Sequence, residues 1–212
     1  MSAAGPQDAV GAGEIAEEEA VNTGAIEEWR RYVARHKLKV AIIAGLVATH
    51  ITTNLGMWYH GLGLPDLNFD LLNGYLVFGN AANAFGKDGF QDPAILTLFG
   101  AAVHYGQGVA FALVFAFGVG PLLPIASTAA GNIIKALIWG AILATLSALW
   151  WVPALFPNLA GPGVGAGLFF SNFGPDQLKW IIALYLWHFV YGLNLGIFYN
   201  PAPGVMTEGA EA

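Results

Sequence analysis

Three histidines that fall inside long apolar stretches are the residues of this chain that could do chemistry. His50, His104 and His188 each lie eight to ten residues from one end of their stretch, which at about 1.5 Å per residue places all three imidazoles near the middle of a bilayer. Ionisable side chains are costly at that depth, and they face the interior of a helix bundle or a partner group. Polar neighbours extend the layer: Asn54, Gln107, Tyr191 and Asn194. The sequence therefore predicts a shared polar layer to which three helices contribute side chains.

Haem b held between two facing helices is one function that this layer could serve. His104 and His188 would be the axial ligands, and His50 a hydrogen-bonding or alternative ligand. A flat macrocycle needs small residues beside each ligand. Glycines stand one turn before and one turn after His104, whereas Leu184 stands one turn before His188. The trough is thus complete beside the first ligand and only half open beside the second.

Helix packing explains the same residues without a cofactor. Small residues spaced four apart are a common packing device of membrane helices, and a buried histidine can hydrogen-bond across to Asn54, Gln107 or a backbone carbonyl. Leu184 narrows the trough, and no second histidine pair occurs at another depth. We therefore prefer this interpretation, with no cofactor, to haem binding.

A metal site formed by His50, His104 and His188 is the third interpretation. Three neutral imidazoles suit copper or zinc, and the chain has no cysteine to offer instead. For zinc, however, the three rings must all come within about 2.0–2.1 Å of one ion. This interpretation ranks last because histidines inside membranes commonly pair with neighbouring groups.

Other catalytic chemistry has little support in the sequence. No Asp or Glu lies inside any of the long apolar stretches, which argues against a carboxylate proton relay. The chain also lacks a Gly-x-Ser-x-Gly elbow, a His-Glu-x-x-His motif and a phosphate-loop lysine. We expect no catalytic activity of its own.

Composition identifies the elements that must position the histidines. Of 212 residues, 56% are hydrophobic and 10% are charged, whereas soluble domains carry about 25% charged residues. Four apolar stretches are long enough to cross a bilayer: Val40–Tyr59, Ala94–Phe117, Ile133–Val152 and Trp180–Tyr199. The predicted fold class is an all-α, polytopic membrane protein with a four-transmembrane-helix bundle. Nucleic-acid binding and ordinary cytosolic enzymology are excluded.

The remaining segments divide the chain further. Residues 1–23 read as a disordered acidic tail, residues 24–39 as an amphipathic basic juxtamembrane helix, and residues 201–212 as a C-terminal tail. They flank a transmembrane domain at residues 40–200. A short interfacial helix with Asp70 as its N-cap is predicted in the first outer loop.

Basic residues set the expected orientation. Five precede the first span: Arg30, Arg31, Arg35, Lys37 and Lys39. Lys135 begins the third span on the same side, and the outer loops hold only Lys87 and Lys179. The positive-inside rule therefore predicts a multi-pass protein of the cell (inner) membrane with both termini in the cytoplasm.

Several short segments carry a resemblance to a known group of proteins. They are Ala44–Thr49, Gly63–Asp66 leading to Asp70 and Gly74, His104 with Gly108–Leu113, and Trp187–Gly192. Over roughly residues 38–200 this pattern resembles small four-helix inner-membrane proteins of bacteria and archaea whose function is unknown. The resemblance implies the four-span architecture and a cell membrane, and it transfers no activity.

The expected function follows from these features. Abundant aromatic residues, long loops and a small-residue face at Gly192 and Gly196 favour an accessory or structural subunit of a larger membrane complex, such as a redox or respiratory one. Its partners would be lipid and other membrane subunits, and not nucleic acid. Haem-b electron transfer is the alternative function, and a small-solute channel or carrier is a weaker third.

Overall fold

Four long apolar helices dominate the structure. The computed structural model describes residues 24–78, 93–155 and 165–205, and these residues contain helices and no strand. The helical stretches long and apolar enough to cross a membrane are Lys37–Gly56, Ala94–Leu122, Ala129–Trp151 and Leu168–Phe198. The predicted all-α, four-span architecture is confirmed. The acidic tail at residues 1–23 and most of the predicted C-terminal tail lie outside the described residues.

Two of the spans contain a π-helical turn. The element bounds are α2 Lys37–Gly56, α3 Phe69–Phe78, α4 Pro93–Val114, α5 Gly120–Leu122, α6 Ala129–Leu146, α7 Val152–Leu155 and α8 Gln177–Phe198. Phe115–Val119 joins α4 to α5 as one π-helical turn, and Ser147–Trp151 joins α6 to α7 as the other. A 3₁₀ segment, Leu168–Asp176, leads into α8. Such π turns interrupt the regular ladder and often accompany functional sites.

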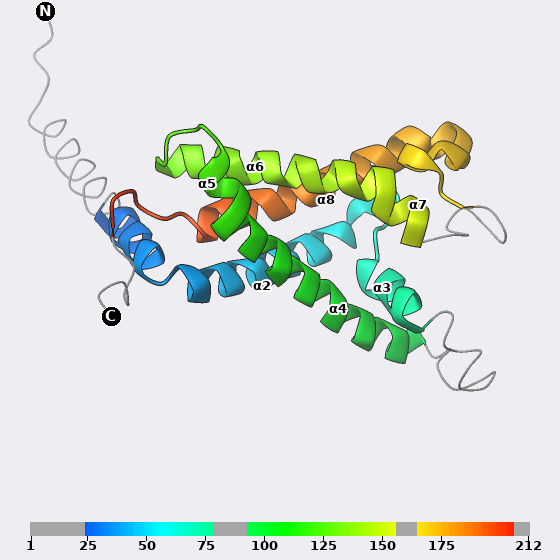
Figure 1. Cartoon of the computed structure of the whole chain (residues 1–212). Helices are drawn as coiled ribbons and strands as arrows, with labels where there is room; N and C mark the ends of the chain where they lie inside the picture. The colour runs from blue at the N-terminus through cyan, green and yellow to red at the C-terminus, as the bar shows by residue number, and fades with distance from the viewer. Residues whose placement is uncertain (1–23, 79–92, 156–164, 206–212) are drawn as a thin grey trace, which may run out of the picture.

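The spans pack as neighbouring pairs rather than as a uniform bundle. Helix α6 packs along α8, α2 packs on both α4 and α8, and α3 packs on α4 (Figure 1). An even number of crossings returns the chain to the side from which it started, and the two described ends lie at the same end of the molecule (Figure 1). The space among α4, α6 and α8 is where the candidate site lies.

Small residues in α8 bring it close to α6. A Cβ added at Gly192 would lie 2.5 Å from the carbonyl oxygen of Ala136, and one at Gly196 would lie 2.8 Å from the Cα of Ile133. Both positions are therefore filled by α6, as expected for small residues at a membrane helix contact. The face that the sequence offered to another subunit is used inside this chain.

The short helix α3 lies against the bundle. A Cβ added at Gly74 or Gly100 would overlap backbone of the opposing helix, so α3 and α4 touch through their main chains. The prediction that Asp70 caps this helix is wrong. The Asn68 side-chain oxygen accepts the hydrogen bond from the Leu71 backbone N–H at 3.0 Å, because Asn68 precedes the first helical turn. Asp70 lies within the helix instead, buried in the bundle.

The predicted basic helix is divided into two parts. Residues 24–35 are helical, the chain bends at His36, and α2 begins at Lys37. Arg30 is buried and donates to the Asn200 side-chain oxygen at 3.2 Å and to the Ser127 carbonyl oxygen at 2.7 Å. It also pairs with Glu27 at 2.9 Å. Arg30 therefore ties the first helix to the loop before α6 and to the end of α8.

We expect Arg30→Ala to loosen this end of the protein. The substitution strands buried oxygen acceptors on two other segments, and losing one partner of a buried polar network costs about 1–3 kcal/mol. Limited proteolysis of the detergent-solubilised protein should show faster cleavage within residues 24–36. The control is Arg31→Ala, because Arg31 is exposed. If proteolysis cleaved Arg30→Ala and Arg31→Ala at the same rate, Arg30 would not hold these segments together.

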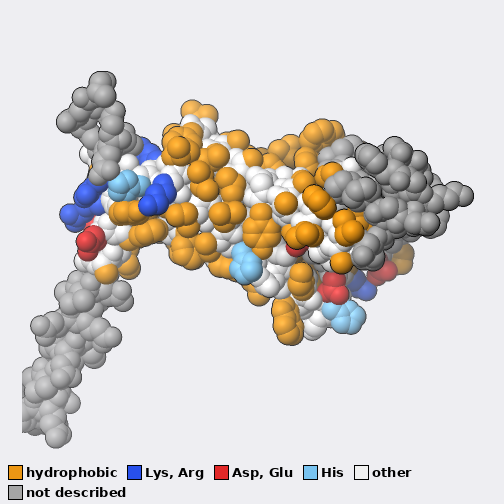
Figure 2. Space-filling view, turned by 90° about the horizontal axis from the view of Figure 1, so that it is seen from below, with side chains coloured by type: hydrophobic (Ala, Val, Ile, Leu, Met, Phe, Trp, Pro, Cys, Tyr) orange, Lys and Arg blue, Asp and Glu red, His pale blue; other side chains and the backbone are white. Residues whose placement is uncertain are grey.

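The surface has the charge distribution of a membrane-spanning protein. In Figure 2, hydrophobic side chains cover the middle of the visible face, and Lys and Arg side chains gather at the end where the described chain begins. Many large apolar residues along the spans are exposed, including Ile43, Leu98, Phe117 and Leu146. An apolar belt between charged ends is what contact with lipid requires.

Candidate functional site

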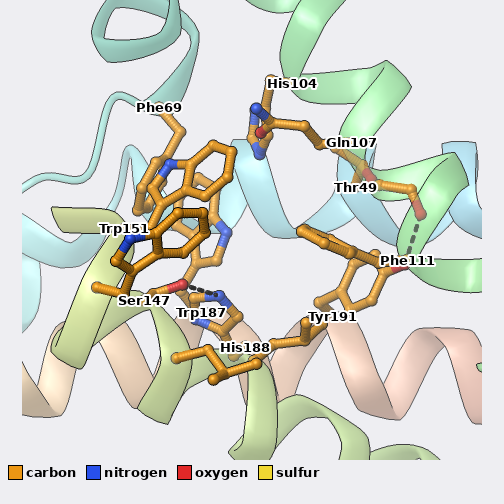
Figure 3. A pocket seen from close by; sticks show the side chains of 14 residues that line it. Thr49, Phe69, His104, Gln107, Phe111, Ser147, Trp151, Trp187, His188 and Tyr191 are labelled. Atoms are coloured by element: carbon orange, nitrogen blue, oxygen red, sulfur yellow. Dashed lines mark hydrogen bonds between the residues drawn. The ribbon is translucent and has the colours of Figure 1, made fainter. Parts of the chain in front are cut away.

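A partly open cavity of ≈ 310 Å³ lies between the helices and is lined by two of the three predicted histidines. Its lining comes from α2, α3, α4, α8 and the span containing α6. The lining residues are Thr49, Phe69, His104, Gln107, Gly108, Phe111, Leu143, Leu146, Ser147, Trp150, Trp151, Trp187, His188 and Tyr191. Figure 3 shows His104 on one side of the cavity and His188 on the opposite side. The structure thus brings these two imidazoles to one site.

His104 is held by a carboxylate from α3. Its Nδ1 lies 2.7 Å from Asp70 Oδ1, and both side chains are about nine-tenths buried. A carboxylate accepts hydrogen bonds and donates none, so with Asp70 ionised the proton of His104 sits on Nδ1. The Nε2 of a neutral His104 then carries a lone pair.

His188 is held by its own helix. Its Nδ1 lies 2.8 Å from the Leu184 carbonyl oxygen, which can only accept, so Nδ1 carries the proton here too. Its Nε2 lies 3.3 Å from the Ser147 hydroxyl, which donates to it. The π-helical turn at Ser147–Trp151 presents this serine to the cavity. Both cavity histidines therefore have an anchored Nδ1 and an accepting Nε2.

Aromatic rings form the walls beside the histidines. Trp187 stacks on His104 with ring centroids 5.7 Å apart and an interplanar angle of 27°. Phe69 packs on Trp187 at 4.8 Å. In Figure 3, Phe69, Trp151 and Trp187 stand on one side of the cavity and Phe111 and Tyr191 on the other. Flat rings on two sides favour a flat ligand between them.

Two other polar side chains of the cavity, those of Tyr191 and Gln107, are hydrogen-bonded to other protein groups. Tyr191 donates its hydroxyl to the Gly108 carbonyl oxygen at 2.6 Å. Gln107 donates to the Asn73 side-chain oxygen at 3.1 Å, and the buried Asn73 donates to the Phe69 carbonyl oxygen at 2.9 Å. These bonds fix the walls. Of the two imidazole Nε2 atoms, that of His188 accepts from Ser147, whereas that of His104 has no hydrogen-bond partner among the described residues.

His50 does not join this site. It is exposed on α2, with its Nδ1 2.7 Å from the Tyr105 hydroxyl and its Nε2 3.2 Å from the Asn54 side-chain nitrogen. Across residues 24–78, 93–155 and 165–205, no three His, Cys, Asp or Glu side chains are grouped so that they could hold a metal ion. The layer predicted from three helices is thus divided into a cavity pair and a separate cluster on the outer surface.

The trough expected for a macrocycle beside His104 is filled by protein. A Cβ at Gly100 would overlap the Asp70 carbonyl oxygen, and one at Gly108 would overlap the Thr49 hydroxyl. Beside the other histidine, Leu184 is fully buried. Gly100 and Gly108 therefore lie at close contacts between helices.

Asp70 is the site residue that sequence reasoning missed. It was assigned to a helix cap because it begins a short amphipathic stretch. Two signals pointed elsewhere: Asn68 is an equally good cap two residues earlier, and Asp70 is the single acid in the apolar run from Phe69 to Phe78. An acid carried into a membrane bundle needs a partner, and the buried His104 provides one.

The comparisons with known proteins do not assign this chain to a family. No protein-family model matches the chain, and neither curated proteins nor solved structures give a match. The resemblance to small four-helix membrane proteins stays an expectation from the sequence.

Proposed function

We propose that this chain is an integral-membrane subunit that binds a quinol, a lipophilic aromatic ring carrying two hydroxyl groups, in the cavity between His104 and His188. The main observation behind this proposal is that the two cavity histidines are bonded in the same way. Each has its Nδ1 proton engaged by a protein oxygen, and each thereby directs an accepting Nε2 toward the same cavity. Two acceptors on opposite sides suit a ring with a donor at each end.

The cavity has the other properties that such a ligand needs. Its volume of ≈ 310 Å³ is at the lower end of the range for small-molecule sites, about 300–1,000 Å³. Its walls are mostly apolar and aromatic, and its polar groups are few. A ligand dissolved in the bilayer can reach a site inside the membrane without crossing water.

In this proposal, the chain's own residues bind and orient the ring. The Asp70 carboxylate keeps His104 in the tautomer that accepts a hydroxyl proton, and it stabilises the imidazolium should that proton be transferred. Ser147 gives His188 a hydrogen bond that the ligand replaces. Binding and orienting a quinol in this way is the role of an accessory subunit of a redox assembly.

Quinol binding tests the proposal directly. Duroquinol added to the purified protein should quench the fluorescence of the tryptophans that line the cavity. We expect His188→Ala to weaken duroquinol binding about tenfold or more, because a ligand hydroxyl loses its buried acceptor. The matched control is His50→Ala, which removes the same group from another span but outside the cavity, and it should bind as the wild type does.

Comparing the quinol with its oxidised form, duroquinone, tests whether the two imidazoles accept hydrogen bonds from the ligand. Duroquinone offers only accepting oxygens, so it should bind more weakly than duroquinol at neutral pH. Tighter binding of duroquinone would contradict the assigned tautomers. Equal binding by wild type and His188→Ala would contradict the site.

Haem b is the second candidate, and one observation favours it. Histidines that ligate a metal commonly donate their other ring N–H to a carboxylate or carbonyl, as both cavity histidines do. Against it, Gly100 and Gly108 contact protein and leave no trough. A Soret band and a sharp reduced α band in the purified protein would replace the quinol proposal with haem, and their loss in His188→Ala would assign the ligand.

We further propose that the protein lies in the cell membrane with both termini in the cytoplasm. The end of the bundle where α2 and α6 begin holds Lys37, Lys39 and Lys135, together with the buried Arg30. The opposite end has Lys179, paired with Asp176 at 2.9 Å. This asymmetry agrees with the positive-inside rule.

A further inference from the structure

A second cavity, of ≈ 220 Å³, lies at the basic end of the bundle. The beginnings of α2 and α6 and the ends of the α4–α5 span and α8 meet there. Its lining residues are Lys37, Phe115, Ala116, Gly120, Pro121, Ser127, Asn132, Lys135, Tyr199, Pro201, Ala202, Pro203, Gly204 and Val205. Because span ends mark the membrane interface, this cavity lies at the level of lipid headgroups.

A buried ammonium group points to what the cavity holds. Lys135 is 6% exposed, and its Nζ donates to the Ser127 hydroxyl at 3.2 Å. Within the described residues, Lys135 forms no ion pair. A charged side chain removed from water without a counter-charge is strongly unfavourable. An anion in the adjoining cavity would remove that cost.

The rest of the lining supports an anionic group on an apolar body. Lys37 adds a second ammonium, and Ser127 and Asn132 add polar side chains. Burial raises the pKa of Tyr199 to about 12, so at neutral pH this phenol is uncharged and does not repel an anion. Proline, alanine and phenylalanine side chains form the remaining wall. One polar side and one apolar side match a phospholipid at its glycerol and phosphate.

We propose that this cavity binds the phosphate group of an anionic phospholipid, with Lys135 and Lys37 as its cationic partners. The depth of the cavity, the uncompensated Lys135 and the apolar wall all agree with a lipid source. Free phosphate shares the ionic chemistry but does not use the apolar wall. Binding here would also join the ends of all four spans, so the lipid should stabilise the fold.

Lipid binding to the purified full-length protein tests the proposal. Dioleoylphosphatidylglycerol should bind in native mass spectrometry and raise the unfolding temperature more than dioleoylphosphatidylcholine does. Each basic residue near an anionic lipid surface contributes enough to change affinity about fivefold. Lys135→Gln should therefore weaken phosphatidylglycerol binding by about fivefold or more. Lys37→Gln should weaken phosphatidylglycerol binding by a similar factor. Lys37 is half-buried at the rim of the cavity, whereas Lys135 is buried in the packed core, so Lys37→Gln is the variant less expected to disturb folding.

Lys179→Gln is the matched control. Lys179 is exposed and is paired with Asp176 at the other end of the bundle, so its loss should leave phosphatidylglycerol binding unchanged. Unchanged binding in both Lys135→Gln and Lys37→Gln would overturn the proposal. An equal gain in unfolding temperature from inorganic phosphate alone would overturn the lipid source and leave a phosphate site.

Discussion

Replacing Gly100 by alanine is expected to destabilise the protein by about 3 kcal/mol or more, the upper part of the range for overpacked interiors. The added Cβ would overlap the Asp70 carbonyl oxygen and crowd the Gly74 backbone nitrogen. Neither is a side-chain end that can rotate away, so α3 must move off α4. The free energy of unfolding, followed by near-UV circular dichroism in detergent, measures the loss.

Gly106→Ala is the matched control on the same helix. A Cβ at Gly106 meets nothing within 4 Å, and alanine favours a helix over glycine by about 1 kcal/mol. This variant should therefore equal or exceed the wild type in stability. Two glycine-to-alanine substitutions six residues apart on α4 should thus change the free energy of unfolding in opposite directions. Equal stabilities would mean that α3 does not depend on this contact.

The same displacement should act on the site. Asp70 is carried by α3, and moving that helix separates the carboxylate from His104. Gly100→Ala protein that remains folded should therefore bind duroquinol less tightly than Gly106→Ala protein. Stability and binding are linked through one main-chain contact.

The spans could be predicted from the sequence because a bilayer sets their length and composition. Charged Lys37 begins α2 inside the predicted basic helix, since a long ammonium side chain can reach the interface while its backbone is helical. The interior-facing side of each helix could not be predicted in the same way. Lipid and protein interior are both apolar, so a membrane helix lacks the polar stripe that marks the outside of a soluble one.

Because the sequence does not show which side of a membrane helix faces the interior, it could not predict which histidines would line the cavity. His104 and His188 line the cavity, whereas His50, at a similar predicted depth, faces outward and bonds Tyr105. Depth follows from counting residues, but the direction in which a side chain points depends on how the helices are rotated in the bundle. Asp70 was missed for a related reason: its partner is 34 positions away, and only the close crossing of α3 and α4 brings them together.

Breaking the Asp70–His104 pair from its two sides should have unequal effects. His104→Leu leaves a buried carboxylate without its partner and should destabilise the protein by about 3–5 kcal/mol. Asp70→Leu leaves an imidazole that can remain neutral, so its cost should be about 1–3 kcal/mol, that of an unsatisfied polar group. Chemical unfolding in a fixed detergent measures both values.

The double variant Asp70→Leu/His104→Leu separates stability from function. Replacing a buried pair by apolar residues of similar volume is commonly neutral or stabilising, so this variant should be more stable than His104→Leu alone. It should nevertheless lose duroquinol binding about tenfold or more, because one of the two acceptors is gone. Additive losses of stability would contradict the coupling of the pair. Wild-type binding by a folded double variant would remove His104 from the ligand site, since an acceptor that matters to the ligand cannot be replaced by an isobutyl group.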